Sequence, residues 1–246
     1  MTDAFKTPVF LITGASSGIG AAVAHTIAHH CPTARLALTG RDTHKLQTVA
    51  NTLANLEAAP LLLTGDVTNP STSTAWVTQT LTAFGRLDCL VNNAGVCGSI
   101  GLVQEVSPQM IDRMIDTNLK GPLYLMQAAL SQAMVAQQSG TIININSVAG
   151  ITAYPYWAVY DASKFGLRAL TEAVAEEQRG NNIRVMGIYP AAVDTPLWQS
   201  IDPNHTPDKG GMLTPQHVAD AVWYTWQQPA HCHIKELILS ALNPSV

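Results

Sequence analysis

The chain has 246 residues, of which 47% are hydrophobic, and this length suits one large α/β domain with a sizeable core. Its 13 lysines and arginines are scattered and its formal net charge is −4, so it lacks the basic surface that a nucleic acid or an anionic membrane requires. Cys31, Cys89, Cys97 and Cys232 form no CxxC pair, which indicates reduced thiols rather than a disulfide framework. No apolar run has the length of a signal peptide or a membrane span, so we expect a cytoplasmic protein.

Short apolar runs typical of β-strands recur along the chain, with segments of helical spacing between most of them. The predicted strands cover residues 8–13, 35–39, 60–64, 88–92, 141–146, 183–188 and 234–239. Strands that alternate with helices need right-handed crossovers, which produce a mostly parallel sheet covered on both faces. We therefore predict an α/β fold in which residues 1–246 form a single domain with a doubly wound, seven-stranded sheet. Residues 190–214 lack a strong pattern and are predicted to be a substrate-binding loop.

The turn after the first predicted strand has the sequence TGASSGIG and opens a helix. Gly14, Gly18 and Gly20 permit a tight turn and let backbone N–H groups approach a pyrophosphate, although any tight strand-to-helix turn can carry glycines. Ligands of open parallel sheets bind at the carboxyl ends of the strands. The residues after the third and fourth strands, Asp66-Val67 and the NNAG sequence at 92–95, are therefore predicted to line the same cleft, with Asp66 and Val67 beside an adenine.

The end of the second predicted strand indicates which dinucleotide binds. Sites that choose NAD place a carboxylate there for the ribose 2′-hydroxyl, whereas a nearby arginine accepts the 2′-phosphate of NADP. Here Gly40 stands where the acid would be and Arg41 follows it. Asp42 comes next, at a position from which it can cap the following helix. The sequence therefore favours NADP, with NAD as the alternative.

The sequence YDASK puts Tyr160 and Lys164 on one face of a helix, one turn apart. A free phenol, with a pKa of about 10, is a poor proton donor near neutral pH. An ammonium roughly 4 Å away contributes on the order of 4 kcal/mol at an effective dielectric constant of about 20. That interaction would lower the pKa of Tyr160 by about 3. Ser147 follows the fifth predicted strand, where its hydroxyl can orient a carbonyl oxygen.

With these motifs the chain resembles the short-chain dehydrogenases/reductases over essentially its whole length. The resemblance is carried by TGASSGIG, Asp66, NNAG, Asn118 in DTNLKG, Ser147 and YDASK. It implies a Rossmann-type NAD(P)-binding fold and a catalytic tetrad of Asn118, Ser147, Tyr160 and Lys164. It also implies that Tyr160 protonates the substrate oxygen, which Ser147 positions. Lys164 would tune Tyr160 and hold the nicotinamide ribose, and Asn118 would hold a water of a proton relay.

One departure from the family pattern follows the sixth predicted strand, where Pro190-Ala191 replaces the usual Pro-Gly. Ala191 is expected to tighten the nicotinamide pocket, while Ile188 and Thr195 still match and can bind the carboxamide. The predicted cofactor-binding residues are Gly14, Ser16, Ser17, Gly18, Ile19, Gly20, Arg41, Asp66, Val67, Asn93, Ala94, Gly95, Tyr160, Lys164, Pro190, Ala191, Val193 and Thr195.

No metal site is predicted. His25 and His29 have the spacing of a ligand pair, but the apolar face formed by Ile19, Val23 and Ile27 turns both toward solvent. The sequence HCH at 231–233 is expected to begin an edge strand, and its metal-like spacing is interpreted as incidental.

The predicted substrate pocket is aromatic and weakly charged, with Tyr154, Trp157 and Trp198 as substrate residues, and suits a small or medium, mainly apolar ketone or aldehyde. A 3-oxoacyl-(acyl carrier protein) reductase is disfavoured because residues 121–140 contain no lysine or arginine for an acidic carrier. A 3-hydroxy acid or serine dehydrogenase would need a cation, and Lys209 is the only one in the loop. An NADP(H)-binding sensor or scaffold is the non-enzyme alternative. The resemblance also implies a homodimer or homotetramer built on the helices near 119–136 and 158–178.

Overall fold

The computed structural model describes residues 7–98, 101–201 and 208–242. Its strands form one sheet in the order β3-β2-β1-β4-β5-β6-β7, and every neighbouring pair is parallel. The strands are β1 Val9–Ile12, β2 Arg35–Gly40, β3 Leu61–Thr64, β4 Cys89–Asn92, β5 Gly140–Ile145, β6 Ile183–Pro190 and β7 Glu236–Leu239. This sheet confirms the predicted doubly wound α/β fold.

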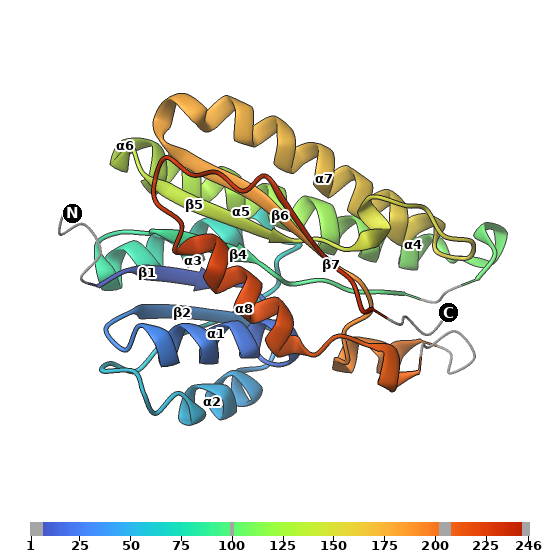
Figure 1. Ribbon diagram of the computed structural model, residues 1–246, viewed down its shortest axis with the longest axis horizontal. Helices are drawn as coiled ribbons and strands as arrows, with labels where there is room; N and C mark the ends of the chain where they lie inside the picture. Colours follow the sequence, from blue (N-terminus) through green and yellow to red (C-terminus); the bar gives the residue numbers. More distant parts are fainter. Residues whose placement is uncertain (1–6, 99–100, 202–207, 243–246) are drawn as a thin grey trace.

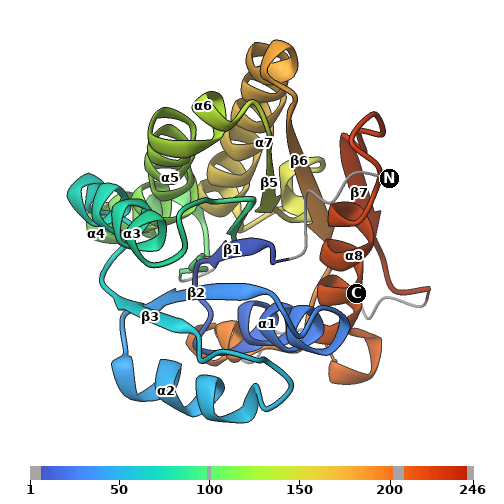
Figure 2. The same ribbon diagram turned by 90° about the vertical axis from the view of Figure 1, so that its left-hand side faces the viewer.

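Helices cover both faces of the sheet (Figures 1 and 2). On one face lie α1 Gly18–His30, α2 Thr43–Thr52 and α8 Pro215–Trp226, and on the other α3 Pro70–Phe84, α5 Gly121–Ala129 and α7 Ala158–Gln178. Side chains alternate along β1 and therefore contribute to two hydrophobic cores. Phe10 and Ile12 belong to the cluster under α1 and α8, whereas Leu11 belongs to the cluster on the opposite face. Both layers are thus anchored on the strand that precedes the glycine-rich turn.

The helix that precedes α5 is not uniformly α-helical. Helix α4, Pro108–Ile115, passes through a π-helical turn, Asp116–Lys120, into α5, and a second π-helical turn, Leu130–Met134, leads to α6, Val135–Gln137. π-helical turns are rare and often occur at functional sites. No helix in the described part of the chain is both long and apolar enough to span a membrane.

Two strand boundaries differ from the sequence prediction by two residues, and the others agree to within one. Strand β7 starts at Glu236, so the expectation that HCH at 231–233 begins this strand is wrong. The reason is that pairing with β6 starts only where Gly187 meets Glu236, whereas the His233 ring hydrogen-bonds the carbonyl of Val185 at 2.9 Å. Strand β6 extends to Pro190, which pairs with Leu239, so the long loop begins one residue later than expected. Residues 202–207 of that loop lie outside the described residues.

Candidate active site

A cleft of about 450 Å³ opens at the carboxyl ends of the strands. Of the residues predicted to bind the cofactor, those that line it are Gly14, Ser16, Ser17, Gly18, Ile19, Arg41, Asp66, Val67, Asn93, Ala94, Gly95, Tyr160, Lys164 and Thr195. Gly20, Pro190, Ala191 and Val193 do not form part of its wall, and neither do Asn118, Ser147, Tyr154, Trp157 and Trp198. Segments from five separate strand ends therefore converge on one cavity.

The glycine-rich turn has the backbone that its sequence predicts. Gly14 and Gly18 have φ values of 64° and 53°, in the left-handed region that favours glycine. A side chain at Gly20 would collide with the carbonyl oxygen of Gly14. Asn93 fixes the turn from β4, because its Nδ2 donates to the carbonyl oxygens of Thr13 at 2.8 Å and Gly14 at 3.2 Å. Asn93 therefore supports the turn and lines the cleft as well.

The start of α1 is a suitable site for an anion. Its N-cap residue, Ser17, makes no side-chain capping hydrogen bond within the described structure. The first N–H groups of a helix have no partner inside the helix, and together with the helix dipole they attract negative charge. Because Ser16, Ser17 and Gly18 also line the cleft, the residues present fit the diphosphate of a dinucleotide.

Arg41 is exposed and lines the cleft beside Gly40. The neighbouring carboxylate does not neutralise it, because Asp42 caps α2 by accepting a hydrogen bond from the backbone N–H of Lys45 at 3.1 Å. That hydrogen bond also lowers the pKa of Asp42. Among the described residues, Arg41 has no carboxylate partner. The capping role predicted for Asp42 is confirmed.

At the other end of the cleft, Tyr160 lies in the first turn of α7 with its hydroxyl close to the side chain of Ser147, which follows β5. Lys164 is 5% exposed, its Nζ lies 5.7 Å from the centroid of the Tyr160 ring, and it donates to the carbonyl oxygen of Ile145 at 3.1 Å. The structure thus brings together three of the four residues predicted to be catalytic.

The expectation that Tyr160 has a lowered pKa is wrong. Burial raises the pKa of the Tyr160 phenol above its ordinary value, and the hydrogen bond from Ser147 only partly opposes this rise. Burial also lowers the pKa of Lys164 to about 8. Loss of water disfavours the charged form of each group and is the largest cause of both shifts.

Asn118, the fourth member of the predicted tetrad, lies in the π-helical turn. Its side chain pairs with the backbone of Val96 in both directions, at 2.8 Å each, and its Nδ2 also donates to Ser163 Oγ at 3.1 Å. Ser163 Oγ in turn donates to the carbonyl oxygen of Tyr160 at 2.7 Å. Asn118 therefore connects the loop after β4 to the turn of α7 that carries Tyr160. Its role in a water relay stays a prediction.

Of the three predicted substrate residues, Trp157 lies beside Tyr160 and Trp198 lies beside Trp157. The Trp157 ring meets the Tyr160 ring edge-on at a centroid distance of 5.6 Å and the Trp198 ring at 6.0 Å. Trp198 is held by its Nε1, which donates to the carbonyl oxygen of Val193 at 2.8 Å. Tyr154 is 43% exposed and lines neither this site nor the cleft. Its backbone N–H instead donates to the Asp161 carboxylate at 2.8 Å.

The alanine that departs from the family pattern causes no backbone strain. Ala191 lies outside the left-handed region of φ, and its N–H donates to the carbonyl oxygen of Leu239 at 2.8 Å. A glycine is therefore not required at this position.

The sequence predicts that residues 96–102 line the pocket, and Cys97 does so, but sequence reasoning missed other residues of the cleft, among them Arg113 and Asn146. Cys97 also lines a small cavity of about 10 Å³ beside Tyr160 and Trp157, and burial raises the pKa of its thiol to about 12. Asn146 had a usable signal, because two asparagines alternate with isoleucines in a buried strand sequence, TIININ. Arg113 carries no comparable signal, because only the path of α4 brings it to the cleft.

Comparison with known proteins agrees with this geometry. The family model described as short chain dehydrogenase matches residues 8–206. An uncharacterised oxidoreductase of Staphylococcus saprophyticus is 38% identical over 230 residues, which cover 93% of this chain and 95% of that protein.

Solved structures of similar proteins cover nearly the whole chain. An alcohol dehydrogenase from the archaeon Thermococcus sibiricus, complexed with 5-hydroxy-NADP, has a TM-score of 0.86 and 28% identity, with 96% of this chain and 97% of that chain covered. A 3-ketoacyl-(acyl-carrier-protein) reductase from Brucella melitensis, complexed with NADH, has a TM-score of 0.85 and 28% identity over 96% of this chain and 97% of that one. The chain therefore belongs to the short chain dehydrogenase family and is an oxidoreductase.

Proposed function

We propose that this oxidoreductase uses NADP(H) to interconvert a carbonyl compound and a secondary alcohol, with a small to medium, mainly apolar substrate. The observation that carries the proposal is that Tyr160, which lies close to Ser147, lines the same cleft as the glycine-rich turn. A proton donor and an anion-binding helix start then lie along one cavity, as hydride transfer from a dinucleotide requires.

In the reductive direction a bound nicotinamide would supply the hydride for the carbonyl carbon. Tyr160 donates its phenolic proton to the carbonyl oxygen, so the C=O bond becomes an alcohol and the phenol becomes a phenolate. Ser147 orients that oxygen through its hydroxyl. Lys164 stabilises the phenolate with its positive charge, and its buried position strengthens that interaction relative to water.

The preference for NADP rests on Arg41. Its guanidinium lines the cleft next to Gly40 and has no carboxylate partner in the described structure, while Asp42 is engaged at the start of α2. A free guanidinium suits the 2′-phosphate of NADP, and no carboxylate is placed for the 2′-hydroxyl of NAD. Similar proteins have been solved with an NADP compound and with NADH, so the residues of this chain carry the argument.

The proposed substrate is apolar because the small cavity beside Tyr160 is mainly apolar and aromatic. The small cavity beside it is lined by residues without charge: Cys97, Gly98, Val106, Met114, Tyr156, Trp157, Val159 and Tyr160. Lys209, the cation that a hydroxy acid would need, instead forms an exposed ion pair with Asp194 at 3.1 Å. This pairing weighs against a 3-hydroxy acid or serine dehydrogenase.

A reductase for substrates on acyl carrier protein is also less well supported. The carrier is acidic, and α5 has no lysine or arginine to meet it. On α7, the guanidinium of Arg168 is engaged by Glu172 at 3.0 Å and Glu236 at 2.8 Å. The proposed assembly is a homodimer or homotetramer, since Leu123 on α5 and Phe165 on α7 are each 40% exposed.

The test is an NADPH-consumption assay with apolar ketones and aldehydes, 3-oxo esters and, in the oxidative direction, 3-hydroxy acids. We expect turnover of apolar carbonyls with NADPH to exceed turnover with NADH. Tight cofactor binding without turnover of any compound would refute the proposal and would favour the alternative of an NADP(H)-binding sensor or scaffold. Highest activity on a 3-oxoacyl carrier substrate would replace it with the carrier-dependent reductase.

A further inference from the structure

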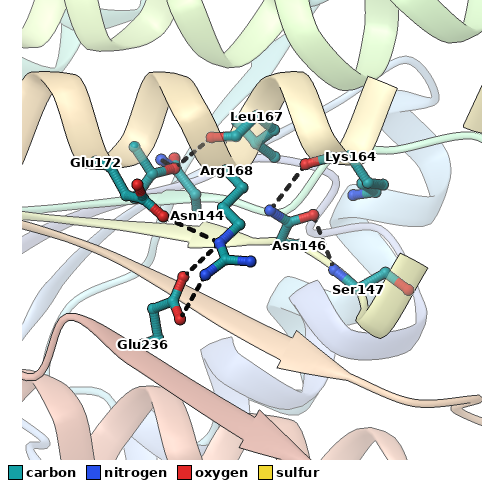
Figure 3. Close-up of polar contacts among 9 residues, drawn as sticks. Asn144, Asn146, Ser147, Lys164, Leu167, Arg168, Glu172 and Glu236 are labelled. Atoms are coloured by element: carbon teal, nitrogen blue, oxygen red, sulfur yellow. Dashed lines mark hydrogen bonds and ion pairs between the residues drawn. The ribbon is translucent and has the colours of Figure 1, made fainter. Parts of the chain in front are cut away.

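The buried amide of Asn146 contacts two of the candidate catalytic residues at once (Figure 3). Its Oδ1 accepts a hydrogen bond from the backbone N–H of Ser147 at 3.0 Å, and its Nδ2 donates to the backbone carbonyl of Lys164 at 3.2 Å. The residue is 3% exposed and lines the cleft. One side chain therefore joins the end of β5 to the helical turn that carries Lys164.

The two contacts need an amide. Ser147 and Lys164 belong to separate elements, and their reactive groups must both reach Tyr160 from different sides. A backbone N–H needs an acceptor and a backbone carbonyl needs a donor, and an amide supplies both, whereas a carboxylate can only accept. The backbone N–H of Asn146 also donates to the carbonyl oxygen of Ile188 at 2.8 Å, which fixes the residue against β6.

The amide has little room to move. A Cβ added at Gly150 would lie 2.8 Å from Asn146 Oδ1 and 2.9 Å from the carbonyl oxygen of Lys164. The backbone of the turn after Ser147 therefore packs closely against both partners of the hydrogen bond. A side chain confined in this way can hold its neighbours within the small tolerances that catalysis needs.

We propose that Asn146 is a positioning residue of the reaction, which keeps the Ser147 hydroxyl and the Lys164 ammonium in the register in which both face Tyr160. This inference rests on the proposed function, because it assigns Asn146 a part in the reaction of the same site. Displacement of a reacting group by about 1 Å can lower a rate by about 100-fold. Loss of the amide should therefore lower kcat more than it changes substrate or cofactor binding.

The chain offers a matched control two residues earlier on the same strand. Asn144 is fully buried, accepts from Asn92 Nδ2 at 2.9 Å and donates to Thr171 Oγ1 at 2.8 Å. Figure 3 shows it beneath α7, where its partner Thr171 lies seven residues after Lys164. These contacts involve none of Ser147, Tyr160 and Lys164, so Asn144→Ala removes buried amide contacts without affecting the candidate catalytic residues.

The experiment compares Asn146→Ala, Asn144→Ala and the wild-type full chain with NADPH and the best carbonyl substrate of the panel. For Asn146→Ala we expect kcat to fall about 10- to 100-fold, while KM and the NADPH dissociation constant change less than about threefold. Asn144→Ala should lower the melting temperature but keep kcat within about twofold. Equal kcat in Asn146→Ala and Asn144→Ala, with the wild type active, would overturn the inference without affecting the proposed function.

Asn146→Asp gives a second readout that also serves if Asn146→Ala does not fold. A protonated carboxyl can donate to the Lys164 carbonyl and accept from the Ser147 N–H, as the amide does, whereas its ionised form can only accept. Lys164 and Tyr160 face this position and titrate in the wild type too, so the informative quantity is the ratio of variant to wild-type kcat. We expect that ratio to fall as pH rises through the ionisation of the new carboxyl. A ratio that is independent of pH contradicts the inference.

Discussion

Lys164 places its Nζ 5.7 Å from the centroid of the Tyr160 ring while it donates to the carbonyl oxygen of Ile145 at 3.1 Å. The amine is therefore close enough to act on the phenol but is held by the end of β5. Because both groups are buried, their pKa values move toward the neutral forms, upward for Tyr160 and downward for Lys164. The folded protein thus carries a free-energy cost for the charge of Lys164, and this cost depends on pH.

The first prediction concerns stability as a function of pH. The pKa of Lys164 is about 8 in the folded protein and near 10.5 in the unfolded chain. Between these values the unfolded chain binds more protons, so the free energy of unfolding contributed by this group rises with pH. Relative to Lys164→Met, the free energy of unfolding of the wild type should rise by about 3 kcal/mol between these two pH values. Below the lower value the difference between the two proteins should not change with pH. Urea unfolding across this range measures the difference, and parallel curves for the two proteins would contradict it.

The second prediction concerns proton transfer. Tyr160→Phe removes the hydroxyl that contacts Ser147 but keeps the ring against Trp157, so NADPH affinity should change less than about threefold. A general acid typically contributes 10²- to 10⁴-fold, so kcat should fall by at least about 100-fold. Tyr224→Phe is the control, because Tyr224 is 52% exposed on α8 and should keep full activity. Steady-state kinetics and fluorescence titration with NADPH provide the two measurements, and unchanged turnover in Tyr160→Phe rules out its role as proton donor.

The third prediction concerns cofactor choice. Arg41→Ala should raise the dissociation constant of NADPH about 10- to 100-fold, since a hydrogen bond to a charged group contributes about 1.5–3 kcal/mol. The constant for NADH should change little, because NADH has no 2′-phosphate. Arg179→Ala is a suitable control, since Arg179 pairs with Glu176 on the exposed end of α7. An NADPH-to-NADH ratio that stays the same in Arg41→Ala would show that specificity resides elsewhere.

The fourth prediction concerns Asp161, next to Tyr160. Its Oδ2 accepts from the Tyr154 N–H at 2.8 Å, while its buried Oδ1 has no partner among the described residues, and burial raises the carboxyl pKa. Asp161→Ala leaves the Tyr154 N–H unpaired, at a cost of about 1–3 kcal/mol.

Asp161→Asn keeps an acceptor and removes the charge. A raised folded pKa means that the stability this group contributes is present at acid pH and is lost as pH rises through the folded pKa. Asp161→Asn should therefore be at least as stable as the wild type at neutral pH, with the advantage shrinking toward acid pH. Thermal unfolding of both variants checks this. If the Asp161→Asn protein were as unstable as the Asp161→Ala protein, a neutral acceptor for the Tyr154 N–H would not be enough to stabilise the fold.

The sequence alone predicts the sheet well because its strands are nearly continuous apolar runs, and it predicts the glycine-rich turn because only glycine suits Gly14, Gly18 and Gly20. It also predicts the cap at Asp42, a local contact. It fails where the answer depends on burial or distant packing. The pKa of Tyr160 is set mainly by its burial, which the spacing of residues in the sequence does not reveal. Tyr154 lies away from the cleft because Asp161 binds the backbone of its loop.

The π-helical turn at Asp116–Lys120 has a consequence for how this chain tolerates insertions and deletions. Such a turn holds one residue more than an α-helical turn, and each residue of an α-helix rotates the chain by about 100°. Deleting one residue there would give a more regular helix, yet it would rotate Asn118 away from Val96 and Ser163. A chain shortened in this way should fold with good helix geometry and still be a poor enzyme. The reason is that the π-helical turn orients the Asn118 amide toward Val96 and Ser163.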